Sequence, residues 1–159
     1  MKITIAAVGK VKERFYTDAI AEYSKRLGRY CRLEIIQVAD EKTPDRAGEA
    51  LTRQIRDREG ERILAQIREG AYVVALAIEG RMLDSVELAS RIGSLGTGGC
   101  SQIVFVIGGS LGLSEAVLRR ADLKLSFSRM TFPHQLMRVI LLEQIYRSFR
   151  ILAGEPYHK

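Results

Sequence analysis

The sequence contains few of the residues from which metal centres and disulfide frameworks are built. Its 159 residues include two cysteines, two histidines and no tryptophan. Cys31 and Cys100 make no CxxC pair, and His134 and His158 lie far apart, so we expect neither a bound metal nor a disulfide framework. Isolated cysteines of this kind are typical of a protein in a reducing cytoplasm.

Long apolar runs are missing as well. No segment approaches the roughly 18 apolar residues that cross a bilayer. The first apolar run, in "MKITIAAVGKVKERF", is too short for a signal peptide and is soon followed by charged residues. We therefore expect a cytoplasmic protein with no membrane partner.

Positive charge is in excess. The chain has 25 Lys and Arg against 19 Asp and Glu, a net charge of +6. This excess favours an anionic partner such as RNA or DNA, although many small soluble proteins are basic without binding nucleic acid. The basic segments "GKVKERF" and "SKRLGRYCR" are candidates for contact with phosphates, and a solvated helix face is the alternative interpretation.

Predicted strands alternate with predicted helices along the whole chain. Apolar and β-branched runs predict strands over residues 2–8, 33–38, 72–78, 103–107 and 123–127. Helical periodicity predicts helices over residues 13–27, 46–69, 85–95, 114–121 and 134–153. The first helix has Phe15, Ala19, Ile20, Tyr23 and Leu27 at its apolar positions. Such alternation indicates one α/β domain over residues 1–159, with a mostly parallel sheet flanked by helices.

Two glycines mark expected irregularities. Gly60 is a weak point in the long charged helix 46–69, and Gly80 is expected to turn the chain after the third strand. Ligands of a parallel sheet bind at the carboxyl ends of its strands. We therefore expect ligand-binding residues in the segments at the ends of the third, fourth and fifth strands.

The stretch "FVIGGSLGLSEAVL" joins the fourth strand to a helix through three glycines. Its spacing does not match the G-x-G-x-x-G of dinucleotide-binding proteins, and no GK[ST] loop of nucleotide triphosphatases is present. Two interpretations remain. The glycines form a tight turn, or their bare backbone lets a flat ligand lie against the chain.

A second stretch, "SFSRMTFPHQLMRV", favours the ligand interpretation. Phe132 precedes Pro133 and is biased towards an extended conformation. Pro133 is a favoured first residue of a helix, and the loop from Phe127 to Phe132 comes directly before it. We expect its backbone amides to be free to bind a base such as adenine.

Three stretches together resemble the bacterial ribosomal RNA large subunit methyltransferase H family: "FVIGGSLGLS", "LSFSRMTFPHQLMRVILLEQIYRSFRI" and the terminal "PYHK". The resemblance covers essentially the whole chain. It implies a SPOUT-class α/β fold with a C-terminal trefoil knot, S-adenosyl-L-methionine as cofactor and a homodimer with its active site at the dimer interface. It also implies methylation of N3 of a pseudouridine in a stem-loop of 23S ribosomal RNA. The small size of the chain and the lack of an added RNA-binding module favour the hypothesis that the assembled ribosome supplies the recognition surface.

The same resemblance implies the residues of the cofactor site: Leu76, Gly108, Phe127, Ser128, Arg129, Met130, Thr131 and Phe132. Two alternatives to the function remain open. The protein is a SPOUT methyltransferase that acts on another ribosomal or transfer RNA position, or it binds ribosomes without catalysis.

Methylation of the acceptor nitrogen requires loss of its proton, so a base or a positive environment is expected near it. The candidates are Arg138, Tyr157 and His158, with Lys159 beside them. A solvated tail is the alternative for His158, and a surface salt bridge or dimer contact is the alternative for Arg138. For His134, a cap or packing role is expected rather than proton transfer.

The final predicted helix is apolar around most of its circumference. A helix of this kind must be buried on two sides. The core of the chain covers one side, and a second subunit is the expected cover for the other. Complete burial within one subunit is the alternative.

Overall fold

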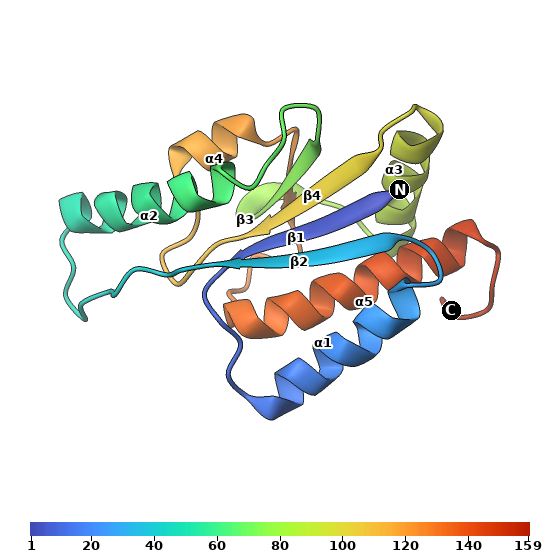
Figure 1. Cartoon of the computed structure of the whole chain (residues 1–159), viewed down its shortest axis with the longest axis horizontal. Coiled ribbons are helices and arrows are strands. Elements are labelled where there is room, and N and C mark those ends of the chain that lie inside the picture. The colour runs from blue at the N-terminus through green and yellow to red at the C-terminus, as the bar shows by residue number, and fades with distance from the viewer.

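The computed structural model describes residues 1–159, and its centre is one five-stranded parallel sheet (Figure 1). The strands lie in the order β2-β1-β4-β3-β5, and every neighbouring pair is parallel. Their bounds are β1 (Lys2–Val8), β2 (Arg32–Val38), β3 (Tyr72–Met82), β4 (Gln102–Ile107) and β5 (Leu123–Ser126). The predicted α/β class with a parallel sheet is confirmed.

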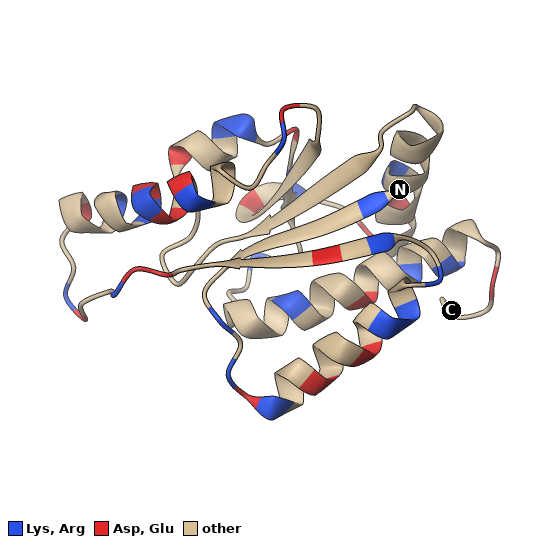
Figure 2. Cartoon of the chain, viewed as in Figure 1, with Lys and Arg blue, Asp and Glu red and all other residues tan.

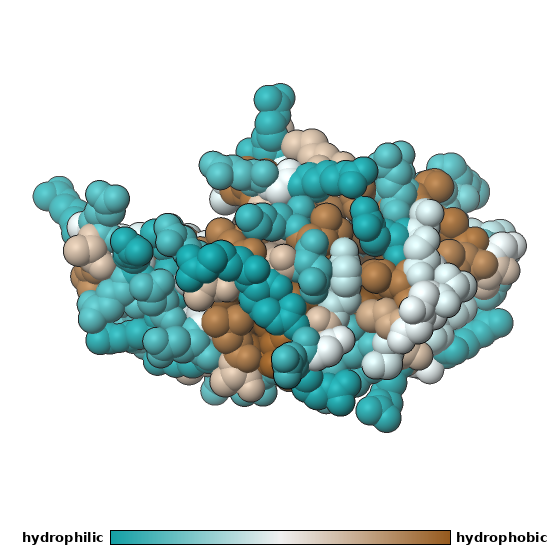
Figure 3. Space-filling model, turned by 90° about the horizontal axis from the view of Figure 1, so that it is seen from above, coloured by the Kyte–Doolittle hydropathy of each residue, from teal (hydrophilic) through white to brown (hydrophobic).

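Helices cover both faces of the sheet. They are α1 (Arg14–Leu27), α2 (Glu49–Leu64), α3 (Ser85–Thr97), α4 (Glu115–Arg120) and α5 (His134–Leu152). Figure 1 shows α1 and α5 together on one face and α2 with α4 on the other, and α3 packs beside α5. The outer surface over α2 is mostly hydrophilic when seen from above (Figure 3), as its charged sequence requires.

β4 explains why the sheet has two separate apolar cores. Every residue of this central strand is buried. Ile103 and Phe105 point into the core under α1, α3 and α5, whereas Val104 and Val106 belong to the core under α2 and α4. A strand with helices on both faces needs a continuous apolar run, which is the pattern in the sequence.

α2 is shorter than the predicted helix 46–69, and Gly60 is not a weak point in it. A Cβ atom at Gly60 would lie 2.3 Å from Oγ of Ser114, the residue that caps α4. Glycine therefore allows α2 to pack closely against the start of α4. The expectation of a weakened helix was wrong because the contact partner is 54 residues away in the sequence.

β3 is longer than predicted, and Gly80 does not end it. The strand continues to Met82 across an irregularity, so that Leu76 and Arg81 both pair with Leu125 of β5. A Cβ atom at Gly80 would lie 2.7 Å from the carbonyl carbon of Lys124. Gly80 is therefore required for close contact with β5 rather than for a turn.

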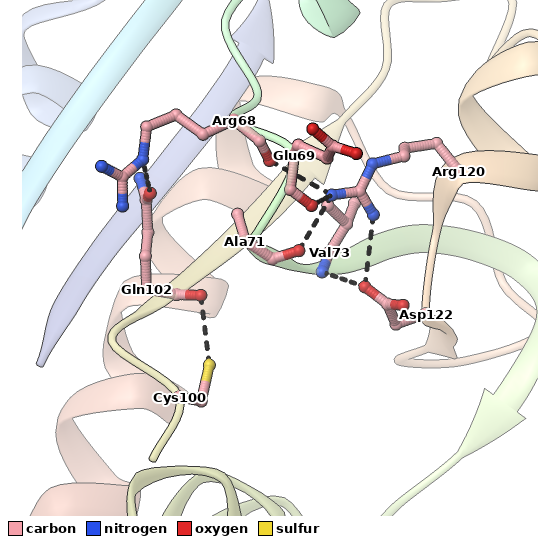
Figure 4. Close-up of polar contacts among 8 residues, drawn as sticks. All are labelled: Arg68, Glu69, Ala71, Val73, Cys100, Gln102, Arg120 and Asp122. Carbon is pink, nitrogen blue, oxygen red and sulfur yellow. Dashed lines mark hydrogen bonds and ion pairs between the residues drawn. The ribbon is translucent and has the colours of Figure 1, made fainter.

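A polar network closes the amino-terminal edge of the sheet (Figure 4). Nη2 of Arg120, at the end of α4, donates hydrogen bonds to the carbonyls of Arg68, Glu69 and Ala71. Asp122 accepts from the backbone N–H of Val73 at 2.8 Å and pairs with Arg120. These contacts tie the turn before β3 to the segment that leads into β5.

Two further expectations concern the whole chain. No helix has both the length and the hydropathy that a bilayer span requires. The trefoil knot implied by the resemblance stays a prediction.

Candidate functional site

The irregular part of β3 and the loops after β4 and β5 meet around one cleft at the carboxyl edge of the sheet. Its empty volume is about 670 Å³, including the part open to solvent. Seven of the eight residues predicted for the cofactor line it: Leu76, Gly108, Phe127, Ser128, Met130, Thr131 and Phe132. The eighth, Arg129, lies in the same loop but is exposed and does not line the cleft.

Nine more residues line the cleft and were not among those predicted for the cofactor: Ala77, Ile78, Ile107, Gly109, Gly112, Leu113, Leu125, His134 and Met137. Most are neighbours of predicted residues on the same strands and loops. Their signal in the sequence was their position at the carboxyl ends of buried strands. Most of the lining is apolar, which suits the face of a flat ring system.

The loop from Phe127 to Phe132 is shaped by two serines. Oγ of Ser126 donates to the carbonyl of Ser128, and Oγ of Ser128 accepts from the N–H of Met130, both at 3.0 Å. The backbone N–H groups of residues 128, 129, 131 and 132 donate to no acceptor in the chain. Backbone donors that secondary structure does not use are available to a ligand, so this loop offers several to the cleft.

The glycine-rich turn over residues 108–112 forms another part of the wall of the cleft. Its own conformation also requires glycine. Gly112 has a φ of +84°, in the left-handed region that favours glycine. A Cβ atom at Gly108 would lie 2.9 Å from the carbonyl group of Gly112. The two interpretations of this turn are therefore compatible, because the same bare backbone makes the tight turn and borders the cleft.

His134, the first residue of α5, borders the cleft. Its Nδ1 atom is buried and has no hydrogen-bond partner in the chain. Burial lowers the pKa of His134, and the positive charge of Arg138 lowers it further. The imidazole is therefore uncharged at neutral pH and is half-buried rather than serving as a cap.

Arg138 lies beneath the site and not in it. Its side chain is 1% exposed, and Nη2 donates to the carbonyls of Val8 and Gly9, both at 2.8 Å. Burial lowers the pKa of this guanidinium. The expected role beside the acceptor base or its phosphate would require the side chain to leave this position. Here it anchors the end of β1.

Tyr157 and His158 lie against the other end of α5. The hydroxyl of Tyr157 donates to Oε1 of Glu143 at 3.0 Å, and Nδ1 of His158 lies 3.2 Å from Nη1 of Arg147. Burial and the bond to Glu143 raise the pKa of Tyr157 to about 12. The structure thus keeps these two predicted residues together, with Lys159 exposed next to them.

The tail does not reach the cleft of its own chain. Met137 is the last residue of α5 that borders the cleft. With a rise of about 1.5 Å per residue, Glu143 and Arg147, which bind Tyr157 and His158, lie roughly 9 and 15 Å farther along the helix. One chain therefore contains the predicted cofactor residues and the predicted tail residues at two separate places.

α5 itself packs between α1 and α3 on one face of the sheet. Leu141, Leu142 and Ile145 are fully buried, and the other apolar residues of α5 are mostly half-buried. Burial within the chain accounts for much of the apolar circumference. The composition of this helix alone is therefore not an argument for a second subunit.

Comparison with known proteins adds independent information. The family model described as "Predicted SPOUT methyltransferase" matches residues 1–158. The chain is 66% identical to ribosomal RNA large subunit methyltransferase H of Bifidobacterium adolescentis and 59% identical to that of Clostridium kluyveri, over 100% of both chains in each case.

Among solved structures, the methyltransferase Lpg2936 of Legionella pneumophila with bound SAM aligns with a TM-score of 0.50 and 11% identity. The alignment covers 96% of this chain and 66% of that one. A probable methylase family protein of Haemophilus influenzae aligns with a TM-score of 0.51 and 10% identity, over 96% of this chain and 66% of the other. These two likenesses concern the fold alone. The family-model match and the full-length relatives show that the chain belongs to the SPOUT methyltransferase family.

Proposed function

We propose that this protein transfers a methyl group from S-adenosyl-L-methionine to N3 of a pseudouridine in a stem-loop of 23S ribosomal RNA. We also propose that it acts as a homodimer on the assembled ribosome, in the cytoplasm. The observation that carries the proposal is the meeting of three separate segments, from β3 and from the loops after β4 and β5, around one apolar cleft. Full-length similarity to proteins named ribosomal RNA large subunit methyltransferase H supports the choice of substrate.

The cleft fits the adenosine half of the cofactor. Leu76, Leu125 and Phe127 supply apolar surface for a ring. The unused N–H groups of the loop 128–132 supply donors for the ring nitrogens of adenine. Gly108 and Gly109 place bare backbone at the wall of the cleft. When bound, the cofactor supplies an electrophilic methyl group on a sulfonium.

The chain must also help the acceptor nitrogen to lose its proton. Tyr157 stays protonated at neutral pH because its pKa is raised to about 12, so it can donate a hydrogen bond but not act as the base. His158 is the other tail residue, and an imidazole nitrogen can accept a proton. We propose that His158 accepts the proton and that Tyr157 orients the ring.

A second subunit would bring the tail to the cleft. The tail lies too far from the cleft of its own chain, so we propose that each cleft is completed by the tail of the partner. Exposed apolar side chains around the cleft support a partner there. Ile78, Met82, Val86 and Met130 are between 48% and 71% exposed. Burial of this surface would favour association.

Incubation of ribosomes with labelled S-adenosylmethionine, followed by mapping of the modified nucleotide, tests the substrate. Label at N3 of a pseudouridine in 23S RNA is expected. Label at another ribosomal position or in transfer RNA would favour a different SPOUT activity. Calorimetry with S-adenosylhomocysteine tests the site, and absence of binding would favour a ribosome-binding protein without catalysis.

Subunit mixing tests the shared site. A variant with Gly108→Val is expected to lose cofactor binding, and a variant that lacks residues 156–159 is expected to lose catalysis. If the partner's tail completes the cleft, mixed dimers of the two variants recover activity through one intact site. No recovery in dimers shown to be mixed would contradict the shared site.

A further inference from the structure

Phe15 is the clearest exception to the apolar pattern of α1. The sequence places it among the apolar positions of this helix, with Ile20, Tyr23 and Leu27. Leu27 is fully buried, but Phe15 is 66% exposed. Its ring lies 4.4 Å, centroid to centroid, from the ring of Tyr16. Phe15 lies in the first turn of α1, which is the end of this helix that is farther from the sheet (Figure 1).

The segment that leads to Phe15 is fixed to the first turn of α5. Arg138 donates a hydrogen bond to the carbonyl of Gly9. The N–H of Lys12 donates to Oε1 of Gln135 at 3.4 Å. A Cβ atom at Gly9 would lie 3.8 Å from Cε1 of His134, which borders the cleft. The exposed aromatic pair is therefore attached next to the candidate site rather than at a distant surface.

Three basic residues precede this aromatic pair, and the acidic Glu13 lies among them. Lys10, Lys12 and Arg14 are all exposed, and Figure 2 shows the basic residues along the segment between β1 and α1. Arg14 is paired with Asp18 at 3.7 Å, whereas no carboxylate lies within ion-pair distance of Lys10 or Lys12. Two unpaired lysines beside two aromatic rings combine a site for phosphates with a surface for stacking.

We propose that residues 9–16 form an RNA-binding segment that holds unpaired nucleotides of the substrate stem-loop next to the cleft. A base stacks on Phe15, and Lys10 and Lys12 contact the phosphates on either side of it. Proteins recognise single-stranded RNA loops by stacking splayed bases on aromatic side chains within a positively charged surface. The buried Arg138 acts as a positioning residue for this segment. This inference rests on the proposed function, because it assumes an RNA substrate.

Steady-state methylation of ribosomes by a Phe15→Ala variant tests the stacking contact. We expect KM for ribosomes to rise roughly 5- to 150-fold, the range that one base stacked on an aromatic side chain supports. We expect kcat and the Kd for S-adenosylhomocysteine to stay unchanged, and Phe15→Trp to retain most of the affinity. Leu51→Ala, at a partly exposed apolar residue on α2, is the matched control.

The lysines are tested by the salt dependence of ribosome binding. The association constant for ribosomes decreases as salt increases, and the slope of its logarithm against log salt is negative. For a variant with Lys10→Ala and Lys12→Ala, the magnitude of this slope is expected to decrease by about 1.5, since each lost phosphate contact removes about 0.7 to 0.9. Lys25→Ala, at the other end of α1, is the control.

An unchanged KM in the Phe15→Ala variant would overturn the proposal. So would conversion of Phe15→Ala from dimer to monomer in sedimentation, which would place Phe15 in a subunit interface instead. If the wild-type protein methylates no RNA, the proposed function fails instead, and the two failures are therefore distinguishable.

Discussion

The two edges of the sheet treat their polar groups in opposite ways. At the amino-terminal edge, Arg120, Asp122 and Gln102 all have hydrogen-bond partners in the chain (Figure 4). At the carboxyl edge, buried polar atoms of Glu59, His134 and Arg138 have none. A buried polar atom without a hydrogen-bond partner destabilises the folded state. Elsewhere in the chain, Nε of Arg150 near the end of α5 is the other buried side-chain atom without a partner. The comparison indicates that the polar groups of the first edge stabilise the fold, whereas those of the second are less completely satisfied.

The largest expected effect is at the amino-terminal edge. Arg120→Ala removes the donor to three carbonyls and the partner of Asp122. We expect the free energy of unfolding to fall by about 3 kcal/mol, as for loss of several hydrogen bonds from a charged group. Urea denaturation measures it. The Kd for S-adenosylhomocysteine should not change, and a weakened Kd would show that the two edges are coupled.

The next effect is at the cleft. Gly108→Ala places a Cβ atom 2.9 Å from the carbonyl group of Gly112 and displaces the turn that borders the cleft. We expect the Kd for S-adenosylhomocysteine to rise about 30-fold, which is about 2 kcal/mol. Calorimetry measures it. Gly70→Ala, where a Cβ atom meets nothing within 4 Å, is the control and should leave binding as it is.

A smaller effect on stability is expected at Arg138. Its buried guanidinium bonds two carbonyls, yet Nε and Nη1 have no partner. Arg138→Met removes a poorly paired buried charge, which favours folding, but it also leaves the carbonyls of Val8 and Gly9 without this donor, which disfavours folding. We therefore expect Arg138→Met to change the free energy of unfolding by less than about 1.5 kcal/mol, while methylation of ribosomes falls. A loss of stability as large as that of Arg120→Ala would remove the contrast between the two edges.

The smallest effect is at Glu59. Burial raises the pKa of this carboxyl. The folded state therefore favours the protonated form, and ionised Glu59 destabilises the fold above its raised pKa. As pH falls through that value towards the ordinary carboxyl pKa, the penalty disappears. Glu59→Gln keeps an acceptor for the N–H of Glu41. We expect it to stabilise the protein by up to about 1 kcal/mol at pH 7 and not at pH 4. Equal stabilities of the two proteins at both pH values would contradict this account.

The strands and most helices could be predicted from the sequence because their signals are local. Apolar runs such as that of β4 and the proline before α5 depend on neighbouring residues only. The three segments of the cleft could be predicted from the rule that ligands bind at the carboxyl ends of parallel strands. The individual residues of the cofactor site were implied by the resemblance, since Leu76, Gly108 and Phe127 meet through the order of the strands. Periodicity within the chain does not give that order.

The features that the sequence does not show share one physical cause, which is contact between distant segments. The inward direction of Arg138 depends on carbonyls 129 and 130 residues away. The roles of Gly60 and Gly80 depend on Ser114 and Lys124, respectively. The exposure of Phe15 depends on how α1 is placed relative to the sheet. Helical spacing shows which residues share a face, but it does not show where the neighbouring elements end.

The register of the sheet also has a consequence for how the chain folds. Lys2 pairs with Arg32 on one side and with Gln102 on the other. The central pair of β1 and β4 therefore joins segments about 100 residues apart, and contacts of such long separation slow the search for the native state. During synthesis, β1 cannot pair with β4 until about 100 further residues have been made. We therefore expect the nascent protein to acquire its final structure late, near release.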